Sequence, residues 1–558
     1  MPTEIITWFD FAQLNDGKGS TLAEFHEQLA RFEKTRLVFI CAMFNWLLGS
    51  TDGSGARRET HDWIVRALFE PQLQPLLTLP KRICIHRLQL LFTIKEALTR
   101  CPDSGLDPFN QMNAGQVGRL LLMANDHLSF QPPTPYDTES KLWNALAQLL
   151  PAHEYSGWNR IENTLARSHV VFMQIVPELR NHPDYVDVRA SFANRTSLSM
   201  PQFWALAFGV MAYYHSHAKP EEIWNDPNKF AVDETYFKNT TLAGSTAGNF
   251  WSAFCTAIEK PAEEISPQSR GPLDFTAFRA RPLFQWGAGR FPVDLLLLAE
   301  NMEAACFWNA HAACSKPEQD RLFRFWGRVF EDYIILLLKT SAEPKLNRVI
   351  DHPHFTDGTE FCDALILSGP DAVLIECKAS VFRADAKYGN DPERLRAEVE
   401  PKLIVEKKGL PQLASGITRA FGRHSQVSVQ GDIDLSRISR VFPLVLCRDD
   451  LGAALAINAI LARRFKRLLD RKAVRPVVTP LFCTSQASFE ILAGYLGRVS
   501  LASILDARYR SDPNLLSTFL AADNQITDQL PRETPALLRD AWRSMSDGFL
   551  PELFNAGT

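Results

Sequence analysis

Apolar residues recur at helical spacing through the first half of the chain. The pattern predicts helices over His61–Phe69, Lys81–Arg100, Gly115–His127, Glu139–Leu150 and Met200–His215. Thr21 and Glu24 have the spacing of a capping box, which predicts a further helix that begins there and runs to Gly49. No repeat of fixed period is visible, although stacking of helix pairs stays open. Residues 1–270 are therefore predicted to be helical.

The pattern changes after Glu259–Pro272, a segment rich in proline, glutamate and serine that predicts a linker. Short apolar runs around turn residues then predict two hairpins, Pro282–Trp286 with Arg290–Leu297 and Ala364–Leu367 with Ala372–Ile375. Helices are expected over Leu298–Ala313, Ser315–Lys339, Glu393–Arg423, Gly452–Arg471 and Leu501–Phe554. Strands are expected over Val441–Cys447 and Pro476–Cys483, so this half is predicted to be α/β.

The length of 558 residues exceeds one ordinary core and predicts several domains. The expected parts are a helical region 1–128, a second helical region 129–270 that the pattern allows to be continuous with the first, an α/β region 271–500, and a helical C-terminal segment 501–558. Phe130–Tyr136, rich in proline, is the predicted linker between the first two. The expected fold class is a large all-helical N-terminal region followed by an α/β region with a mixed central sheet.

Composition adds constraints on location and partners. Hydrophobic residues make up 46% and charged residues 22%, which is typical of a soluble globular protein. The net charge is −4, so nucleic-acid contacts would have to come from local basic patches. The N-terminus has no basic segment of a signal peptide, and the longest apolar run, Leu37–Leu48, is too short to span a membrane. The ten cysteines show no C-x-x-C spacing, so we expect reduced thiols and a cytoplasmic protein.

The second hairpin carries the most unusual charges of the chain. Its turn, Ser368–Asp371, is expected to hold an even number of residues, which places Asp363 directly opposite Glu376. Their Cβ atoms are then about 4.5–5.5 Å apart, where like charges destabilise the pair. Lys378 shares a strand face with Glu376, whereas Cys377 points the other way. A bound divalent cation is the simplest explanation of two facing acids beside a lysine.

This pattern resembles the active-site motif of the PD-(D/E)XK nuclease superfamily, which has a restriction-endonuclease-like fold. The family motif is an acid at the start of one strand and acid-x-lysine at the end of the next, which Asp363 and Glu376-Cys-Lys378 match. A preceding helix in the family often supplies a glutamate from a pattern like Gly-x-x-Phe-Glu, and Gly327-Arg-Val-Phe-Glu331 occupies that place. The resemblance covers roughly residues 275–490 and implies nothing about the first half.

The resemblance implies a magnesium-dependent nuclease, with manganese as an alternative metal. Asp363 and Glu376 would be metal ligands, and the carbonyl of Cys377 would contribute. Lys378 would orient or deprotonate the attacking water and neutralise developing charge, while Glu331 would complete the site directly or through water. The alternative interpretation of the same residues is a salt-bridged strand end beside a surface glutamate.

Further residues are candidates for substrate contact. Some branches of the superfamily carry a glutamine and a tyrosine after the lysine strand; Gln412 lies in that region, but no tyrosine follows at the usual offset, so a plain surface glutamine is the alternative. Segment Arg383–Pro392 is expected to form a loop over the site. A basic helix and its exit are predicted to bind nucleic-acid phosphates, with a solvated helix face as the alternative: Arg463, Arg464, Lys466, Arg467, Arg471 and Lys472.

Other catalytic motifs are missing from the sequence. Gly17-Lys-Gly-Ser-Thr lacks the spacing of a phosphate loop, and neither H-E-x-x-H nor G-x-S-x-G occurs. The pair His352 and His354, in a loop that contains proline, is expected to be structural.

The sequence thus predicts a metal-dependent endonuclease that cleaves DNA, with RNA as the second choice of substrate. By analogy, the helical region would be a sensor, a platform for a partner protein or an oligomerisation surface in anti-phage defence. Two alternatives stay open. One is an inactive nuclease fold that serves as a scaffold or binds nucleic acid, and the other is an effector that stays silent until a partner engages the helical half.

Overall fold

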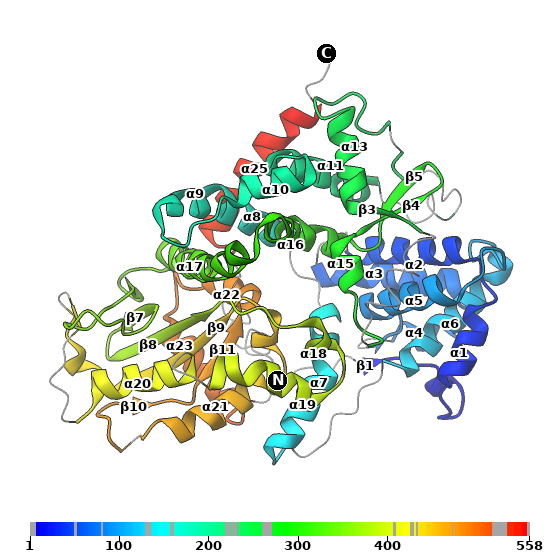
Figure 1. Ribbon diagram of the computed structural model, residues 1–558. Coiled ribbons are helices and arrows are strands. Elements are labelled where there is room, and N and C mark those ends of the chain that lie inside the picture. The colour runs from blue at the N-terminus through cyan, green and yellow to red at the C-terminus, as the bar shows by residue number, and fades with distance from the viewer. Residues whose placement is uncertain are drawn as a thin grey trace.

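The structure is a computed structural model that describes residues 7–49, 53–79, 82–128, 136–156, 161–217, 224, 231–233, 235–258, 271–405, 409–423, 429–430, 433–470, 472–515 and 533–554. The N-terminal helices, drawn in blue, lie at one end of the molecule, and the main sheet lies at the other (Figure 1). The predicted helical N-terminal region and the mixture of strands and helices that follows it are confirmed. The two predicted linkers fall largely outside the described residues.

The first helices pack around α2 (Lys34–Gly49), in which every residue from Leu37 to Leu48 is buried. A helix that is apolar on all sides belongs in the interior of a bundle. Its neighbours in the chain are α1 (Leu22–Leu29), α3 (Gly53–Leu68), α4 (Gln74–Leu77), α5 (Arg87–Arg100) and α6 (Ala114–Asp126). Two short strands, β1 (Thr7–Trp8) and β2 (Arg82–Ile83), pair in parallel beside this bundle.

The prediction of one helix from Thr21 to Gly49 is wrong. The capping box at Thr21 is present, but the helix ends at Leu29 because the chain after it pairs with a distant segment. The N–H of Leu106 donates to the carbonyl of Arg31 over 2.8 Å. Gly105 permits this approach, since a Cβ atom there would lie 2.6 Å from the Arg31 oxygen.

Three other predicted elements also differ in the structure. The helix expected from Lys81 begins at Arg87, because Arg82–Ile83 forms β2. The helix expected over Gly452–Arg471 becomes a short 3₁₀ turn followed by α21 (Ile457–Leu468). The strand expected over Pro476–Cys483 is divided into β10 (Val477–Val478) and β11 (Phe482–Ser485).

A second group of helices surrounds α16 (Leu295–Ala313), which lies near the centre of the molecule (Figure 1). Helices α8 (Ile161–His169), α10 (Val188–Thr196) and α11 (Met200–His217) all contact it. The other elements of this group are α9 (Val176–Glu178), α13 (Ser245–Phe254) and α15 (Thr276–Ala280). Helix α7 (Glu139–Ser156) instead packs against elements of the second half.

The first predicted hairpin is confirmed as an antiparallel pair, β4 (Leu283–Trp286) and β5 (Gly289–Pro292). Strand β3 (Cys255–Ala257) adds to β4 in parallel and makes a three-stranded sheet. This small sheet lies between the N-terminal bundle and α13 (Figure 1).

The main sheet is mixed, as predicted. Its strands are β6 (Arg348–Asp351), β7 (Ala364–Ser368), β8 (Asp371–Lys378), β9 (Arg440–Cys447), β10 and β11. Strands β6, β7 and β8 form an antiparallel meander, and β9 lies parallel to β8. Both β10 and β11 pair in parallel with β9, on the edge away from β8.

Helices cover both faces of the main sheet. Ile366 and Ile375 join the core that includes α17 (Lys316–Ser341), α22 (Gln486–Ala493) and α23 (Leu501–Ser511). Leu365 and Leu374 join a second core with α7, α19 (Pro392–Val399), α20 (Leu410–Phe421) and α21. This alternation along each strand is the pattern of a sheet buried on both faces.

The C-terminal helix α25 (Ala536–Phe554) returns to the helices of the first half. It contacts α8, α11 and α17, and Figure 1 shows it in red beside the teal helices. Helical segments from both ends of the sequence therefore share one hydrophobic core with one face of the main sheet.

A buried polar network joins α7 to the segment that follows the lysine strand. Glu154 Oε1 accepts hydrogen bonds from Arg279 at 2.6 Å and from the Tyr388 hydroxyl at 3.0 Å, and Glu154 Oε2 lies 2.9 Å from Lys387 Nζ. Burial opposes the charge of Glu154, but Lys387 and Arg279 lower its pKa to about 2. The prediction of a loop over the site at 383–392 is wrong, because this network holds the segment as helix α18 (Ala384–Tyr388).

All ten cysteines are free thiols, and most of them are buried. Among the described residues, no helix combines the length and the apolar character that a transmembrane segment needs.

Candidate active site

The turn between β7 and β8 sets the register of the central hairpin. It consists of two residues, Gly369 and Pro370. Gly369 has φ of +61°, and proline fixes φ near −65°, which together match a type II′ turn, one of the favoured two-residue hairpin turns. With this register, Asp363 comes opposite Glu376 at the open end of the hairpin, as predicted.

The structure brings Asp363, Glu376 and Lys378 together. The two acids are only 4% and 1% exposed. Lys378 Nζ donates to Glu376 Oε1 at 2.5 Å, and the backbone N–H of Cys377 donates to Asp363 Oδ2 at 2.6 Å. By strand alternation, the three charged side chains lie on the sheet face that α20 covers, and the Cys377 side chain lies on the other.

Burial dominates the electrostatics of this group. It raises the pKa of Glu376 to about 8, and the nearby Asp363 adds to the effect. Burial also raises the pKa of Asp363, against the opposing influence of Lys378 and the Cys377 N–H. Burial works against the charge of Lys378, but Glu376 and Asp363 outweigh it and raise the pKa of the ammonium group. Lys378 therefore stays charged at neutral pH and serves as a donor and counter-charge.

Glu331 lies on α17, which covers the face of the sheet on which Cys377 lies. Burial, followed by the charge of Asp363, raises the pKa of Glu331 to about 7. Arg328 lies one turn earlier on the helix, with its guanidinium 3.8 Å from Glu331. The charge of the helix glutamate predicted from Gly-x-x-Phe-Glu thus interacts with that of Asp363, and its membership of the site stays a prediction.

A cluster beside the site was not predicted from the sequence. The imidazole of His352 lies 3.6 Å from Asp332 and 3.4 Å from Glu360, and Arg328 forms a 2.9 Å ion pair with Asp332. The neighbouring carboxylates of Asp332 and Glu360 raise the pKa of His352 to about 9, so it is a cation at neutral pH.

The same cluster is tied to the hairpin by the backbone. The N–H of His352 donates to the carbonyl of Asp363 at 3.0 Å, and His352 has φ of +41°, a left-handed conformation that non-glycine residues seldom adopt. The signal available in the sequence was the i, i+4 pair Arg328–Asp332 on the helix that also carries Glu331.

Gln412 lies half-buried in the first turns of α20. It shares a helix face with Gly416, which lies against the carbonyl of Phe361, since a Cβ atom on Gly416 would be 2.8 Å from that oxygen. Phe361 is two residues before Asp363. Gln412 is therefore on the helix face directed at the hairpin, and its role in the site stays a prediction.

Several of the predicted nucleic-acid-binding cations make contacts within the protein. Arg463 donates to the carbonyls of Tyr136 and Asp137, and Arg464 bonds Glu139 and Glu400, both at 2.7 Å. Arg467 lies 3.3 Å from Glu139. These arginines join α21 to the start of α7. Lys466 and Lys472 are exposed, and Arg471 lies outside the described residues, so nucleic-acid binding by this set stays a prediction.

The raised pKa of Glu376 predicts a pH-dependent stability. Between the ordinary pKa of 4.5 and about 8, the folded protein keeps a proton that the unfolded chain has lost, so the free energy of unfolding falls as pH rises through this window. Replacing Glu376 with glutamine removes this titration. In urea denaturation without metal, we expect the variant to lose less stability than the wild type between about pH 5 and about pH 8, by about 1 kcal/mol or more.

The matched control is Glu393→Gln, which changes an exposed carboxylate on α19 and should keep the wild-type pH profile. If the stability of Glu376→Gln varies with pH as that of the wild type does, the pKa of this carboxyl in the folded state is not raised.

The donor set fits a small divalent cation. Two hard carboxylates converge, and Glu376 Oε2 is buried without a hydrogen-bond partner, so an electron-rich oxygen is left without a donor. No cluster of three or more histidine, cysteine, aspartate or glutamate side chains with metal-binding geometry occurs in the described part of the chain. Magnesium is commonly held by one or two carboxylates, with water and substrate phosphate completing the shell.

Comparison of this chain with profiles of known protein families, with curated proteins and with solved structures found no match.

Proposed function

We propose that this protein is a metal-dependent nuclease with a restriction-endonuclease-like fold in its second half. The observation that carries the proposal is the buried convergence of Asp363, Glu376 and Lys378 at the open end of one hairpin. Glu331 on α17 interacts electrostatically with Asp363. Burying two facing acids is unfavourable for folding, and acids with strongly perturbed pKa values cluster at functional sites.

Each side chain has a role that its environment supports. Asp363 and Glu376 hold Mg²⁺ or Mn²⁺, with the Cys377 carbonyl as an additional oxygen donor. When bound, the cation supplies electrostatic stabilisation of the phosphate and acidifies coordinated water. Lys378, kept charged by the two acids, donates hydrogen bonds to phosphate oxygens or to the attacking water. Because Lys378 is charged, it is suited to orienting the attacking water and neutralising charge on the phosphate, and not to removing a proton from that water.

Glu331 is suited to proton transfer. A carboxyl with a pKa of about 7 exchanges its proton near neutral pH, which is the property a general acid or base requires. Arg328 and His352 oppose this rise in the pKa of Glu331, and both are themselves paired with carboxylates, Asp332 and Glu360.

We propose DNA as the substrate, by the resemblance of the motif, and a sensor or partner-binding role in anti-phage defence for the helical half. The Glu154 network supports such a coupling, because α18 follows the lysine strand directly and is held by α7 and Arg279.

The activity is tested by incubating the purified chain with supercoiled plasmid DNA and, in a parallel arm, with single-stranded RNA. We expect DNA strand cleavage with Mg²⁺ or Mn²⁺ and none with EDTA. Cleavage of RNA alone would reassign the substrate, and no cleavage of either with any divalent ion would favour the inactive scaffold.

Metal binding is tested independently by thermal unfolding. Mg²⁺ at ten to a hundred times its dissociation constant should stabilise the wild type by about 1–3 kcal/mol. Asp363→Asn, which removes one ligand charge at nearly constant volume, should abolish most of this stabilisation. Equal stabilisation of the wild type and the variant would place the metal elsewhere.

A further inference from the structure

A group of exposed cations gathers at the edge of the main sheet that β10 forms. Two segments far apart in the sequence supply it. Arg423 follows the end of α20, whereas Lys472 and Arg475 lie between α21 and β10. All three residues are exposed, and together they form what we call the edge cluster.

Backbone hydrogen bonds hold the two segments of the edge cluster together. The N–H of Arg423 donates to the carbonyl of Ala473, and the N–H of Arg475 donates to the carbonyl of Phe421, both at 2.9 Å. The side chain of Arg423 is also fixed, because its Nε donates to the carbonyl of Lys472 at 2.8 Å. The fold therefore sets the positions of these cations relative to one another.

The charges of the edge cluster are available to a partner. Among the described residues, no carboxylate forms an ion pair with any of the three side chains. Two acids lie beside them. Asp470 accepts a hydrogen bond from the N–H of Lys472 at 3.0 Å, and Asp434, which interacts electrostatically with Arg475, lies 3.3 Å from the guanidinium of Arg437. The cluster is thus locally positive on a chain whose net charge is −4, so it favours an anionic partner.

The edge cluster lies on the same side of the main sheet as the candidate site. Both α20 and α21 cover the face on which the charged side chains of that site lie. Lys378 pairs with Cys447 at one end of β9, and Arg440 at the other end pairs with Val477 of β10. The two ends of β9 are about 23 Å apart at about 3.3 Å per residue. This is the length of about seven base pairs of a DNA duplex.

We propose that the edge cluster binds the phosphate backbone of a DNA duplex that extends from the candidate site. The choice of DNA over another polyanion rests on the proposed function. Arginine and lysine bind phosphates through charge and the release of counterions, without reading the sequence. Because Nε of Arg423 is bonded to the protein, its two terminal nitrogens are already oriented and can donate to phosphate oxygens.

DNA binding in EDTA tests the edge cluster without any cleavage. The readout is the fluorescence anisotropy of a labelled duplex of about 20 base pairs, titrated with the full chain at several salt concentrations. We expect Arg423→Gln, Lys472→Gln and Arg475→Gln, combined in one variant, to weaken binding by about tenfold or more. Each lost phosphate contact lowers the slope of log affinity against log salt by about 0.9, so the slope should fall by about 2 to 3.

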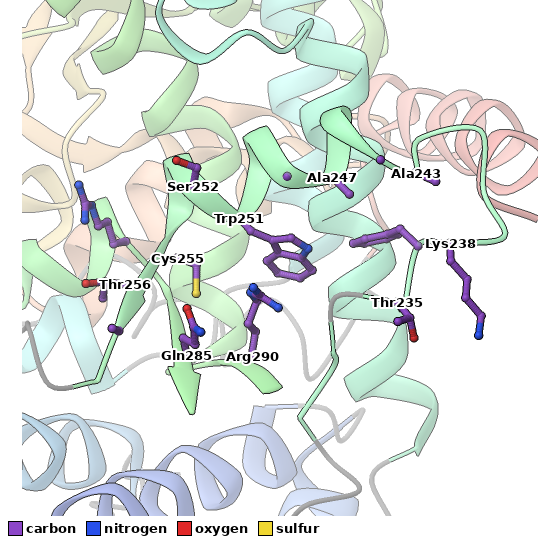
Figure 2. A pocket seen from close by; sticks show the side chains of 15 residues that line it. Thr235, Lys238, Ala243, Ala247, Trp251, Ser252, Cys255, Thr256, Gln285 and Arg290 are labelled. Carbon is purple, nitrogen blue, oxygen red and sulfur yellow. The ribbon is translucent and has the colours of Figure 1, made fainter. Parts of the chain in front are cut away.

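A matched control removes three exposed lysines from other surfaces, Lys238, Lys316 and Lys345, and changes the net charge by the same amount. Lys238 lines a cavity beside α13 in the helical half, as Figure 2 shows. Salt screens charges that lie farther apart than about 10 Å, so this variant should keep the wild-type salt slope and bind within about threefold of the wild type.

A double variant guards against misfolding of the triple variant. Lys472→Gln with Arg475→Gln leaves the bond from Arg423 Nε to the backbone in place. It should lower the salt slope by about 2 while circular dichroism and the thermal unfolding midpoint stay at their wild-type values.

Four results would overturn the assignment. They are no binding of the duplex by the wild type, a wild-type salt slope in the folded variants of the cluster, an equal loss of binding in the lysine control, and binding of polyglutamate as tight as that of DNA. The last result would assign the cluster to an acidic protein. If the variants lose binding as expected but no divalent ion supports cleavage, the proposed nuclease activity fails and the edge cluster stands.

Discussion

Lys378→Ala is expected to lower phosphodiester cleavage by at least about a hundredfold while the protein stays folded. Lys378 is the cation that donates directly to Glu376, and the pKa of its ammonium group is raised, so it stays charged at neutral pH. Alanine removes the donor for the phosphate or the attacking water. The fold should survive, because Glu376 already has a pKa of about 8 and becomes neutral at little cost when its partner is lost.

The rate of plasmid cleavage should be measured beside circular dichroism and the thermal unfolding midpoint of each variant. Lys345→Ala removes an exposed lysine just before β6 and is the matched control, which should cleave at the wild-type rate. Lys378→Arg keeps the charge but changes its geometry, so we expect only partial recovery. Wild-type cleavage by folded Lys378→Ala would exclude this lysine from the reaction and assign the activity to another site or a contaminant.

The largest expected effect on stability is at the ion pair between Arg87 of α5 and Asp294, the N-cap of α16. Both side chains are 0% exposed, and the guanidinium contacts the carboxylate at 2.8 and 3.0 Å. Arg87 also reaches the carbonyl of Tyr155 in α7 at 3.3 Å, so it joins three helices. Arg87→Met leaves a buried carboxylate without its counter-charge, and we expect a loss of about 3–5 kcal/mol or insoluble protein.

A double-mutant cycle separates the pair from the rest of the core. Asp294→Asn keeps an oxygen that accepts from the N–H of Leu297 and caps α16. It leaves the buried charge of Arg87 without a counter-charge, so it should lower the free energy of unfolding by a similar amount. The double variant should recover part of this loss, since it buries no unpaired charge. Arg324→Met, which breaks an exposed ion pair with Asp184, is the control and should cost about 1 kcal/mol or less. Strict additivity in the buried cycle would show that the two side chains are not coupled.

Much of the fold followed from local signals in the sequence. The two hairpins, the mixed sheet, the capping box at Thr21, the helix that begins after Ser315 and the helical character of the first half were predicted and are confirmed. Helical periodicity, strand alternation and turn chemistry depend on residues a few positions apart, so they can be recognised in the sequence alone. The same holds for the facing acids, because a two-residue turn fixes the register of the strands that it joins.

Distant pairing could not be predicted in this way. Helix α1 ends at Leu29 because the following residues bond with Leu106. Helix α5 begins after the predicted residue because Arg82–Ile83 pairs with a strand near the N-terminus. Arg463 and Arg464 belong to a basic cluster that predicted a nucleic-acid-binding surface. In the structure, Arg463 bonds to Tyr136 and Arg464 to Glu139 within the protein.

The sequence by itself determined the local elements of this protein and the three charged residues of its central hairpin, because neighbouring positions specify these. Only the tertiary structure decided that His352 belongs to a charged cluster beside the site, and that Arg463 and Arg464 contact the start of α7 and the residues before it. Each of these features joins segments tens to hundreds of residues apart. Their contacts arise when the hydrophobic cores assemble, and no pattern within one segment specifies its partner.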